Sequence, residues 1–453
     1  MNRKKYIFSI LFALSLLIQL SCSSDDDPIE IDQVTEESQE EPDNGNNDGN
    51  NNNQGGGENG GGDDGPVIEF LNRELTANGY ILINDASANR VYLMDREATI
   101  VHEWNLNGER LGNDVQLLAD GTLLANLESA DPKITIGGFG GKLKLLDKDG
   151  NSLWDFEYSS NDYILHHDAE LLPNGNVLSM VWERKSIEEA QEAGYELAVE
   201  VFPEAIIEIN PQTNEIVWEW YAWDHLIQDF DQSKSNFGIV ADNPQRIDVN
   251  YVVREDGDIT HANGIAYNAA KDVIYLSVNF YSEVWVIDHS TTTEEAATSS
   301  GGNYNKGGDL IYRFGNPGAY GNPQGERLFY NNHFPNLLTG EDEGKMLIYV
   351  NGGEQMQSTV YELALPTEFN LLPNTDNELE VLWSFTDPDL FSQKVSGAVK
   401  LANGNRLITE GDFGVWEVTD SGEVVWKYSR PGFYWRAYHF ERDDPEIVAL
   451  GIE

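Results

Sequence analysis

Two hydrophobic patterns alternate along the chain from residue 79 onward. The first is an apolar strand, a tight Asn-Gly or Asp-Gly turn and a second apolar strand, and its clear copies span residues 115–127, 169–181 and 398–410. Looser copies span residues 264–278 and 335–350. Asn-Gly and Asp-Gly pairs suit the positive φ angles of two-residue hairpin turns, so each copy predicts a β-hairpin.

The second pattern is a strand, a polar turn and a strand that carries an aromatic residue. Its copies span residues 91–104, 143–156, 206–220 and 415–428. One copy of each pattern makes a four-stranded unit, and the aromatic of the outermost strand recurs six times, at Trp104, Trp154, Trp218, Tyr312, Trp383 and Trp426. Four-stranded repeats of about 40–50 residues are typical of β-propeller blades.

The two ends of this repeat predict how the ring closes. The first unit, residues 79–104, lacks an innermost strand, whereas residues 435–441 follow the last unit. We therefore expect an all-β, six-bladed β-propeller of four-stranded blades, residues 67–453, in which the C-terminal strand completes the first blade and removes the open sheet edges. A β-sandwich or an open array of sheets is the alternative. Insertions occupy residues 185–200, with a helical pattern, and residues 221–258 and 289–308.

The N-terminus predicts export. Three basic residues, Arg3 to Lys5, precede an apolar stretch over residues 6–20, and Cys22, the single cysteine of the chain, follows. This order predicts a lipoprotein signal peptide, residues 1–21, with acylation of Cys22 after cleavage. The acidic residues after Cys22 resemble a surface-export tag of bacterial lipoproteins. We expect an outer-membrane lipoprotein exposed at the cell surface or, alternatively, facing the periplasm.

Composition defines a tether and limits the partners. Residues 22–66 are rich in Asn, Gly and acidic residues and are too poor in apolar residues to fold, so we expect a flexible tether. The chain has 78 acidic and 28 basic residues, a net charge of -50. Such a surface repels nucleic acid and anionic headgroups, so we expect membrane contact only through the lipid anchor.

Four histidines fall at equivalent places in three consecutive blades. His166 and His167, His261 and His333 each precede the turn of an innermost hairpin by seven to nine residues, and innermost strands of a propeller line its axis. We expect these imidazoles to meet at the mouth of the channel, with Arg436 and Tyr438 arriving on the closing strand. Ordinary strand-end histidines are the alternative. Three imidazoles could bind a metal ion and leave one coordination position open, or they could transfer a group, with one imidazole as the nucleophile and another as the acid. The spacing of the histidines in the sequence does not distinguish these two functions.

Residues 165–440 resemble the bacterial arylsulfotransferases that need no nucleotide sulfate. The matching phrases are residues 166–176, 258–265, 285–293, 307–317 and 436–438. The resemblance implies a six-bladed propeller that moves a sulfuryl group from a phenolic sulfate ester to a phenolic acceptor. It also implies a sulfated histidine intermediate and neither a cofactor nor a metal.

The resemblance assigns roles to single residues. His333 would be the nucleophile, although Asn331-Asn332 precedes it where the family has Gln. His261 and His167 would bind the sulfuryl oxygens or act as acid and base. The substrate-binding residues would be His166, Asn263, Asn279, Arg313, Arg436 and Tyr438. Asn279 stands where the family has arginine, and Arg436 or Arg313 would supply the missing charge.

Two other functions remain open at this point. One is a non-catalytic surface propeller that binds sulfated, phenolic or glycan ligands, which the asparagine at position 279 favours. The other is a metal-dependent hydrolase that uses the same histidines.

Overall fold

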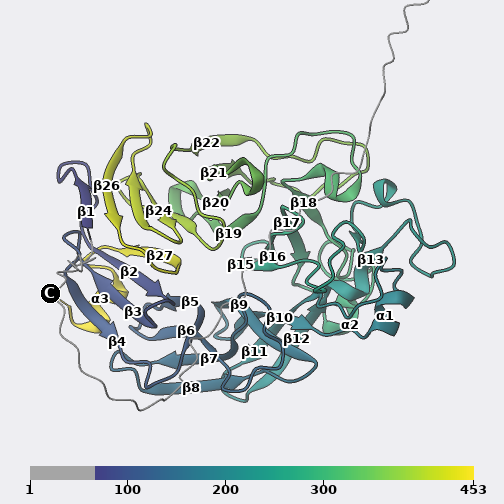
Figure 1. The fold of residues 1–453 in the computed structure, drawn as a ribbon, viewed down its shortest axis with the longest axis horizontal. Coiled ribbons are helices and arrows are strands. Elements are labelled where there is room, and N and C mark those ends of the chain that lie inside the picture. Colours follow the sequence, from purple (N-terminus) through teal and green to yellow (C-terminus); the bar gives the residue numbers. More distant parts are fainter. Residues whose placement is uncertain (1–66, 453) are drawn as a thin grey trace, which may run out of the picture. The chain divides into compact units, whose positions relative to one another are not determined.

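The structure, a computed structural model, describes residues 67–452, which form six antiparallel sheets around an axis (Figure 1). The predicted signal peptide, Cys22 and the tether lie outside the described residues. Each sheet is a blade whose strands follow one another from the axis outward. The all-β, six-bladed propeller predicted from the repeat is therefore confirmed.

The first three blades are built as follows. Blade 1 consists of β27 (Tyr434–Phe440), β2 (Tyr80–Asp85), β3 (Arg90–Met94) and β4 (Ile100–Trp104). Blade 2 consists of β5 (Leu111–Leu117), β6 (Leu123–Glu128), β7 (Gly141–Leu146) and β8 (Ser152–Glu157). Blade 3 consists of β9 (Tyr163–Leu171), β10 (Val177–Glu183), β11 (Glu204–Asn210) and β12 (Glu215–Tyr221).

The other three blades have the same order. Blade 4 consists of β15 (Ala262–Asn268), β16 (Val273–Val278), β17 (Glu283–Asp288) and β18 (Tyr312–Phe314). Blade 5 consists of β19 (Asn332–Leu337), β20 (Lys345–Val350), β21 (Thr359–Ala364) and β22 (Val381–Phe385). Blade 6 consists of β23 (Gly397–Lys400), β24 (Arg406–Glu410), β25 (Gly414–Val418), β26 (Val424–Ser429) and β1 (Val67–Leu71).

Closure joins the two ends of the propeller chain. Strand β27 pairs antiparallel with β2, with Leu82 opposite Tyr438, as the sequence predicted. The innermost strands β27, β5, β9, β15, β19 and β23 contact one another in turn around the ring. Strand β1 was not predicted: it pairs with β26 and gives blade 6 a fifth, outermost strand. This pairing covers one outer sheet edge.

The burial pattern explains why the blades stack. Middle strands such as β16 and β17 are buried at every position, because apolar residues of both faces pack against neighbouring blades. Outer strands such as β8 alternate between buried and exposed side chains. The predicted outer aromatics fall on these outer strands, where Trp104, Trp154 and Trp426 are buried.

Short elements occupy the insertions and the C-terminus. The predicted helical insertion contains α1 (Ile187–Glu192), which begins with a capping box at Ser186. The remaining elements are β13 (Leu226–Ile227), β14 (Ile247–Asp248), α2 (Thr293–Ala296), α3 (Pro445–Leu450) and five 3₁₀ helices (Ala222–His225, Val240–Asp242, Pro317–Tyr320, Gly340–Asp342 and Gly353–Gln355). In the part of the chain that the structure describes, no helix has the length and apolar character needed to cross a membrane.

Candidate functional site

Bulges in the innermost strands aim polar residues at the axis. Five of the six innermost strands lose register with their neighbour in this way. The irregular segments include Asp114, His167, Asp168, Asn263, Phe334 and Arg436. A bulge bends a strand and redirects a side chain, and bulges are common beside active sites.

The backbone at and beside the histidines adopts left-handed conformations. His167 and His261 have φ angles of 51° and 48°, in the left-handed region, and Phe334 next to His333 has 55°. Non-glycine residues in that region cost about 1–3 kcal/mol each and persist only where the surrounding structure imposes them. The neighbouring blades thus hold the histidines in place at an energetic cost.

The structure brings the predicted histidines into one neighbourhood. The ring centroids of His167 and His261 are 5.0 Å apart. Asn279 lies between His261 and His333. Its backbone N–H donates to the carbonyl of His261 at 3.3 Å, and its Nδ2 lies 3.5 Å from His333 Nδ1. All three imidazoles are buried, with at most 9% of each residue exposed.

Each of the three imidazoles has a different partner on its Nδ1 atom. His333 Nδ1 lies 2.6 Å from Asn351 Oδ1. His261 Nδ1 lies 2.5 Å from Asp258 Oδ2. His167 Nδ1 lies 2.9 Å from the Nδ1 atom of His166. The partners are therefore an amide, a carboxylate and a second imidazole, which tune the three rings differently.

The tautomer of His333 follows from its amide partner. Asn351 Nδ2 donates to the carbonyls of Ser392 and Val395 at 2.9 and 3.2 Å, so its Oδ1 must be the atom that faces His333. An amide oxygen only accepts, so His333 carries its hydrogen on Nδ1 and its lone pair on Nε2. Burial lowers the pKa of His333 to about 3, against the opposing Asn351 hydrogen bond, and the nearby charges of His261 and Arg436 add to the lowering. The ring is therefore neutral at physiological pH.

Arg436 forms an ion cluster on the axis. Its Nη1 donates to Asp114 Oδ2 and Asp168 Oδ2, both at 2.9 Å, and its Nη2 donates to the carbonyl of Asn263 at 3.0 Å. Its guanidinium also lies 4.1 Å from the centre of the Phe334 ring. Burial opposes the charge of Arg436, but the two carboxylates outweigh it and raise the pKa of this residue. The cluster thus ties together innermost strands of five blades.

The polar residues predicted to bind substrate are mostly bonded to protein groups. Asn263 Nδ2 donates to the carbonyl of Asn332 at 2.8 Å, and Asn279 Oδ1 accepts from Asn331 Nδ2 at 2.9 Å. Tyr438 donates its hydroxyl to Asp114. The arrangement holds these side chains firmly around the histidines.

Arg313 lies away from this group. It is on the outer strand β18 and fully buried, and its Nε donates to Glu283 at 2.8 Å. Its other two nitrogens bond to Glu283 and to the carbonyls of Pro244 and Arg246. Because these nitrogens are bonded to protein groups, the contacts do not support the prediction that Arg313 supplies the positive charge missing at Asn279. His439, on the same closing strand as Arg436, bonds to the Asn78 carbonyl instead of joining the histidine group.

Sequence reasoning missed the residues that surround the imidazoles. Trp182 stacks on His166 with ring centroids 3.9 Å apart, and Phe280 stacks on His261 at 4.8 Å. Trp435 lies edge-on to His167 at 5.7 Å, and its buried indole N–H meets no acceptor within the described residues. The Trp-Arg-Ala-Tyr order of the closing strand was the available signal for Trp435, since Arg436 was recognised beside it.

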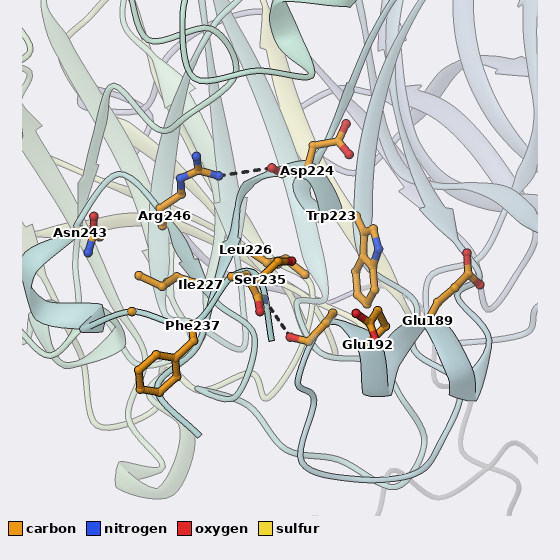
Figure 2. Close-up of a pocket in the computed structure, with 13 residues that line it drawn as sticks. Glu189, Glu192, Trp223, Asp224, Leu226, Ile227, Ser235, Phe237, Asn243 and Arg246 are labelled. Atoms are coloured by element: carbon orange, nitrogen blue, oxygen red, sulfur yellow. Dashed lines mark hydrogen bonds between the residues drawn. The ribbon is translucent and has the colours of Figure 1, made fainter. Parts of the chain in front are cut away.

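A hollow of about 640 Å³ lies away from the histidines. Figure 2 shows it between α1 and the insertion that follows β12, with Trp223 and Phe237 among its lining residues. Arg246 crosses part of it and donates to the carbonyl of Asp224 at 3.3 Å. No histidine lines this hollow. Across residues 67–452, no group of three or more His, Cys, Asp or Glu is arranged to hold a metal ion.

Fold and site together define a six-bladed propeller with buried imidazoles gathered where its innermost strands begin. The arylsulfotransferase (ASST) family model matches residues 68–433, so the chain belongs to the arylsulfotransferase family. The family resemblance read from the motifs is thereby confirmed. A comparison with curated proteins gives no match.

Several solved structures are similar to this chain at low identity. A Bacteroides caccae protein of unknown function is 15% identical with a TM-score of 0.46, covering 80% of this chain and 98% of its own. A putative 6-phosphogluconolactonase from Bacteroides fragilis is 11% identical with a TM-score of 0.40, covering 80% and 98%. BamB from Moraxella catarrhalis is 10% identical with a TM-score of 0.33, covering 83% and 98%. None of these likenesses bears on function.

Proposed function

We propose that this protein is an aryl-sulfate sulfotransferase that carries the sulfuryl group on His333. The observation behind this proposal is the hydrogen bond of His333 Nδ1 to Asn351 Oδ1 at 2.6 Å. It leaves a neutral imidazole with its lone pair on Nε2, which is the form of histidine that acts as a nucleophile. Membership of the arylsulfotransferase family supports the same chemistry.

The reaction divides into two transfers. His333 Nε2 attacks the sulfur of a phenolic sulfate ester, so that an S–N bond forms, the S–O bond breaks and a phenol leaves. A second phenol then attacks the same sulfur, and the electron pair of the S–N bond returns to Nε2. Each step needs one proton moved to or from a phenolic oxygen, which is the work of an acid–base residue near the nucleophile.

The surrounding side chains suit the two halves of the substrate. Phe280 and Trp435 lie beside the imidazoles, where an aryl ring would pack. The buried indole N–H of Trp435 is a donor for a sulfuryl oxygen. The imidazole of His261, which is held by Asp258, is a second group for the reaction: it would act as an acid or a base, or would bind a sulfuryl oxygen.

The test is release of a coloured phenol from p-nitrophenyl sulfate in the presence of an acceptor phenol. We expect turnover by the wild-type protein and none by His333→Ala. His439→Gln is the matched control, because His439 is a histidine of the closing strand that bonds to Asn78 outside the group. If His333→Ala releases phenol as fast as the wild type, His333 is not the nucleophile.

A non-catalytic surface propeller is the second candidate. The asparagine at position 279 and the pairing of Arg436 with two carboxylates favour it, because neither leaves an uncompensated cation for an anionic sulfuryl group. Binding of aryl sulfates, phenols or sulfated glycans without turnover selects this candidate.

We also propose that the protein is an outer-membrane lipoprotein anchored through Cys22. The basic start, the apolar stretch and the single cysteine support this proposal. Cys22→Ala is expected to move the protein from the detergent phase to the aqueous phase. Digestion of intact cells by added protease distinguishes surface exposure from a periplasm-facing position.

A further inference from the structure

Two buried donors beside His167 have no hydrogen-bond acceptor in the part of the chain that the structure describes. One is the side-chain amide of Asn113 on β5: the residue is 0% exposed, and neither Oδ1 nor Nδ2 is bonded, so the NH₂ group is unpaired whichever way the amide is turned. The other is the indole N–H of Trp435 on β27, a residue that is 8% exposed. Buried polar groups nearly always have partners, so two unpartnered donors at one place point to a group that joins them during function.

The ion cluster on the axis brings the strands of both donors together with that of the imidazole. Arg436 Nη1 donates to Asp114 Oδ2 and Asp168 Oδ2, both at 2.9 Å. The residues directly before these three in the chain are Trp435, Asn113 and His167. All three lie in bulges of innermost strands, in the neighbouring blades 1, 2 and 3. Each donor therefore occupies the place in its blade that the imidazole occupies in blade 3.

Contacts within the site confirm that the donors adjoin the imidazole. The rings of Trp435 and His167 are edge-on, with centroids 5.7 Å apart. The loop between β6 and β7 lies against the other donor and the same imidazole: a Cβ atom on Gly140 would lie 2.8 Å from Asn113 Nδ2, and one on Gly138 would lie 2.2 Å from His167 Nε2. The Cα atoms of two residues that are two positions apart are separated by at most about 7 Å. The amide, the indole and the imidazole thus share one neighbourhood.

The two arginines expected to replace the missing cation do not offer a free charge. Arg313 is bonded to Glu283, and Arg436 is paired with two carboxylates. Neutral N–H donors also stabilise an oxyanion, and they do so more strongly in a site shielded from water than in solution. Asn113 and Trp435 supply such donors, because no acceptor among residues 67–452 competes for them.

We propose that Asn113 Nδ2 and Trp435 Nε1 bind the oxygens of the sulfuryl group in place of a cation, an inference that rests on the proposed function. Each side chain donates to a sulfuryl oxygen while the group passes from the phenolic ester to His333 and on to the acceptor. Positive charge on His333 lowers the pKa of His167, so the nucleophile is within electrostatic range of the ring that both donors adjoin. Four of the residues 137–141 are glycines, which gives the covering loop the backbone freedom to lift when the group enters.

Asn113→Leu is the variant that tests the amide, because leucine keeps the branched shape and removes the donor. Replacing an unpartnered buried amide by an apolar group of the same shape is neutral or stabilising, so we expect a midpoint of urea unfolding equal to or above that of the wild type. The burst rate of phenol release from p-nitrophenyl sulfate is expected to fall roughly 10²-fold, the usual cost of removing one oxyanion donor. A merely structural role of Asn113 would lower stability and activity together.

Each donor has a matched control elsewhere in the propeller. The hydroxyl of Tyr275, on the middle strand β16, is a buried donor without an acceptor among the described residues, so Tyr275→Phe should keep both the stability and the burst rate of the wild type. Trp435→Phe removes the indole donor and should lower the burst rate roughly 10²-fold. Trp104→Phe makes the same truncation at a buried, unpartnered indole on the outer strand β4 and should leave the burst rate unchanged.

Calorimetric titration with inorganic sulfate tests the donors without turnover. We expect the wild type to bind sulfate and each donor variant to bind it roughly tenfold more weakly, as for the loss of one hydrogen bond to a charged group. A wild-type sulfate affinity and burst rate in either donor variant overturns the pair and leaves the sulfotransferase intact. A wild type that releases no phenol, but whose sulfate affinity falls in both variants, supports the pair and contradicts the proposed transfer. A wild type that neither binds sulfate nor releases phenol contradicts both.

Discussion

Gly138→Ala tests whether activity depends on the position of His167. Gly138 lies in the loop between β6 and β7, where its carbonyl accepts from the backbone N–H of His167 at 3.1 Å. A Cβ atom at this position would lie 2.1 Å from His167 Cε1 and 2.2 Å from its Nε2. Ordinary contacts begin near 3.4 Å, so the loop or the imidazole must move by about 1 Å.

The expected effect on rate follows from that displacement. A misplacement of about 1 Å in a catalytic group costs roughly 10²-fold, which is about 2.7 kcal/mol of the activation free energy. The φ angle of Gly138 is +86°, and an alanine in this left-handed conformation costs a further 1–2 kcal/mol, roughly, in stability. The first cost appears in the burst rate and the second in the free energy of unfolding.

Gly175→Ala separates the two costs. Gly175 lies in the hairpin turn of blade 3 with a φ angle of +84°, and a Cβ atom added there would have no atom within 4 Å. Gly175→Ala is therefore expected to show the backbone cost alone in urea unfolding, and Gly138→Ala at least that loss of stability, because its clash with His167 adds to the same backbone cost. Only Gly138→Ala is expected to lose activity toward aryl sulfates.

A double-mutant cycle completes the test. In a His167→Ala background, Gly138→Ala is expected to change the burst rate by less than about threefold, because the crowded ring is gone. Equal activities of Gly138→Ala and Gly175→Ala would refute the role of His167. A full 10²-fold loss that persists without the imidazole would refute the steric reasoning.

Three further variants follow from the same contacts. Asn351→Leu removes the acceptor of His333 Nδ1–H, so the burst rate should fall about tenfold, equivalent to one hydrogen bond of ~1.4 kcal/mol, with little change in KM. His333 has a pKa of about 3 when folded and about 6.5 when unfolded, so between these pH values the unfolded chain binds more protons than the folded one, and stability falls as the pH is lowered. When the pH is lowered from 7.5 to 5, urea unfolding should therefore show the wild type losing about 2 kcal/mol more stability than His333→Asn. Arg436→Met leaves Asp114 and Asp168 unpaired and should cost about 3–5 kcal/mol at pH 8. Burial raises the pKa of Asp168 to about 6, so the deficit of Arg436→Met should shrink below that pH.

The blades were predictable because their signals are local. Alternating burial and Asn-Gly or Asp-Gly turns repeat within each unit, and counting units placed the closing strand opposite β2. Strand β1 carried no such signal, since residues 67–71 have no neighbouring hairpin partner in the sequence and pair with β26 at the far end of the chain. Its partner is set by the closure of the ring, which a linear pattern does not display.

The site was predictable in position but not in detail. The common offset of His167, His261 and His333 from their turns was enough to gather them at the axis. What each ring can do depends on Asp258, Asn351 and the His166–Glu204 pair, which reach it from other strand ends. For the same reason the sequence did not show that Arg436 bonds to Asp114 and Asp168, because these carboxylates come from other blades.

The most direct test of the central claim is mass analysis of the protein after exposure to an aryl sulfate without an acceptor phenol. The account predicts a peptide that contains His333, heavier by one SO₃ group, which disappears when phenol is added. The modification should be absent from His333→Ala and present in His439→Gln. A wild-type protein that releases phenol while every peptide keeps its mass, or that carries the group on another residue, would contradict the account.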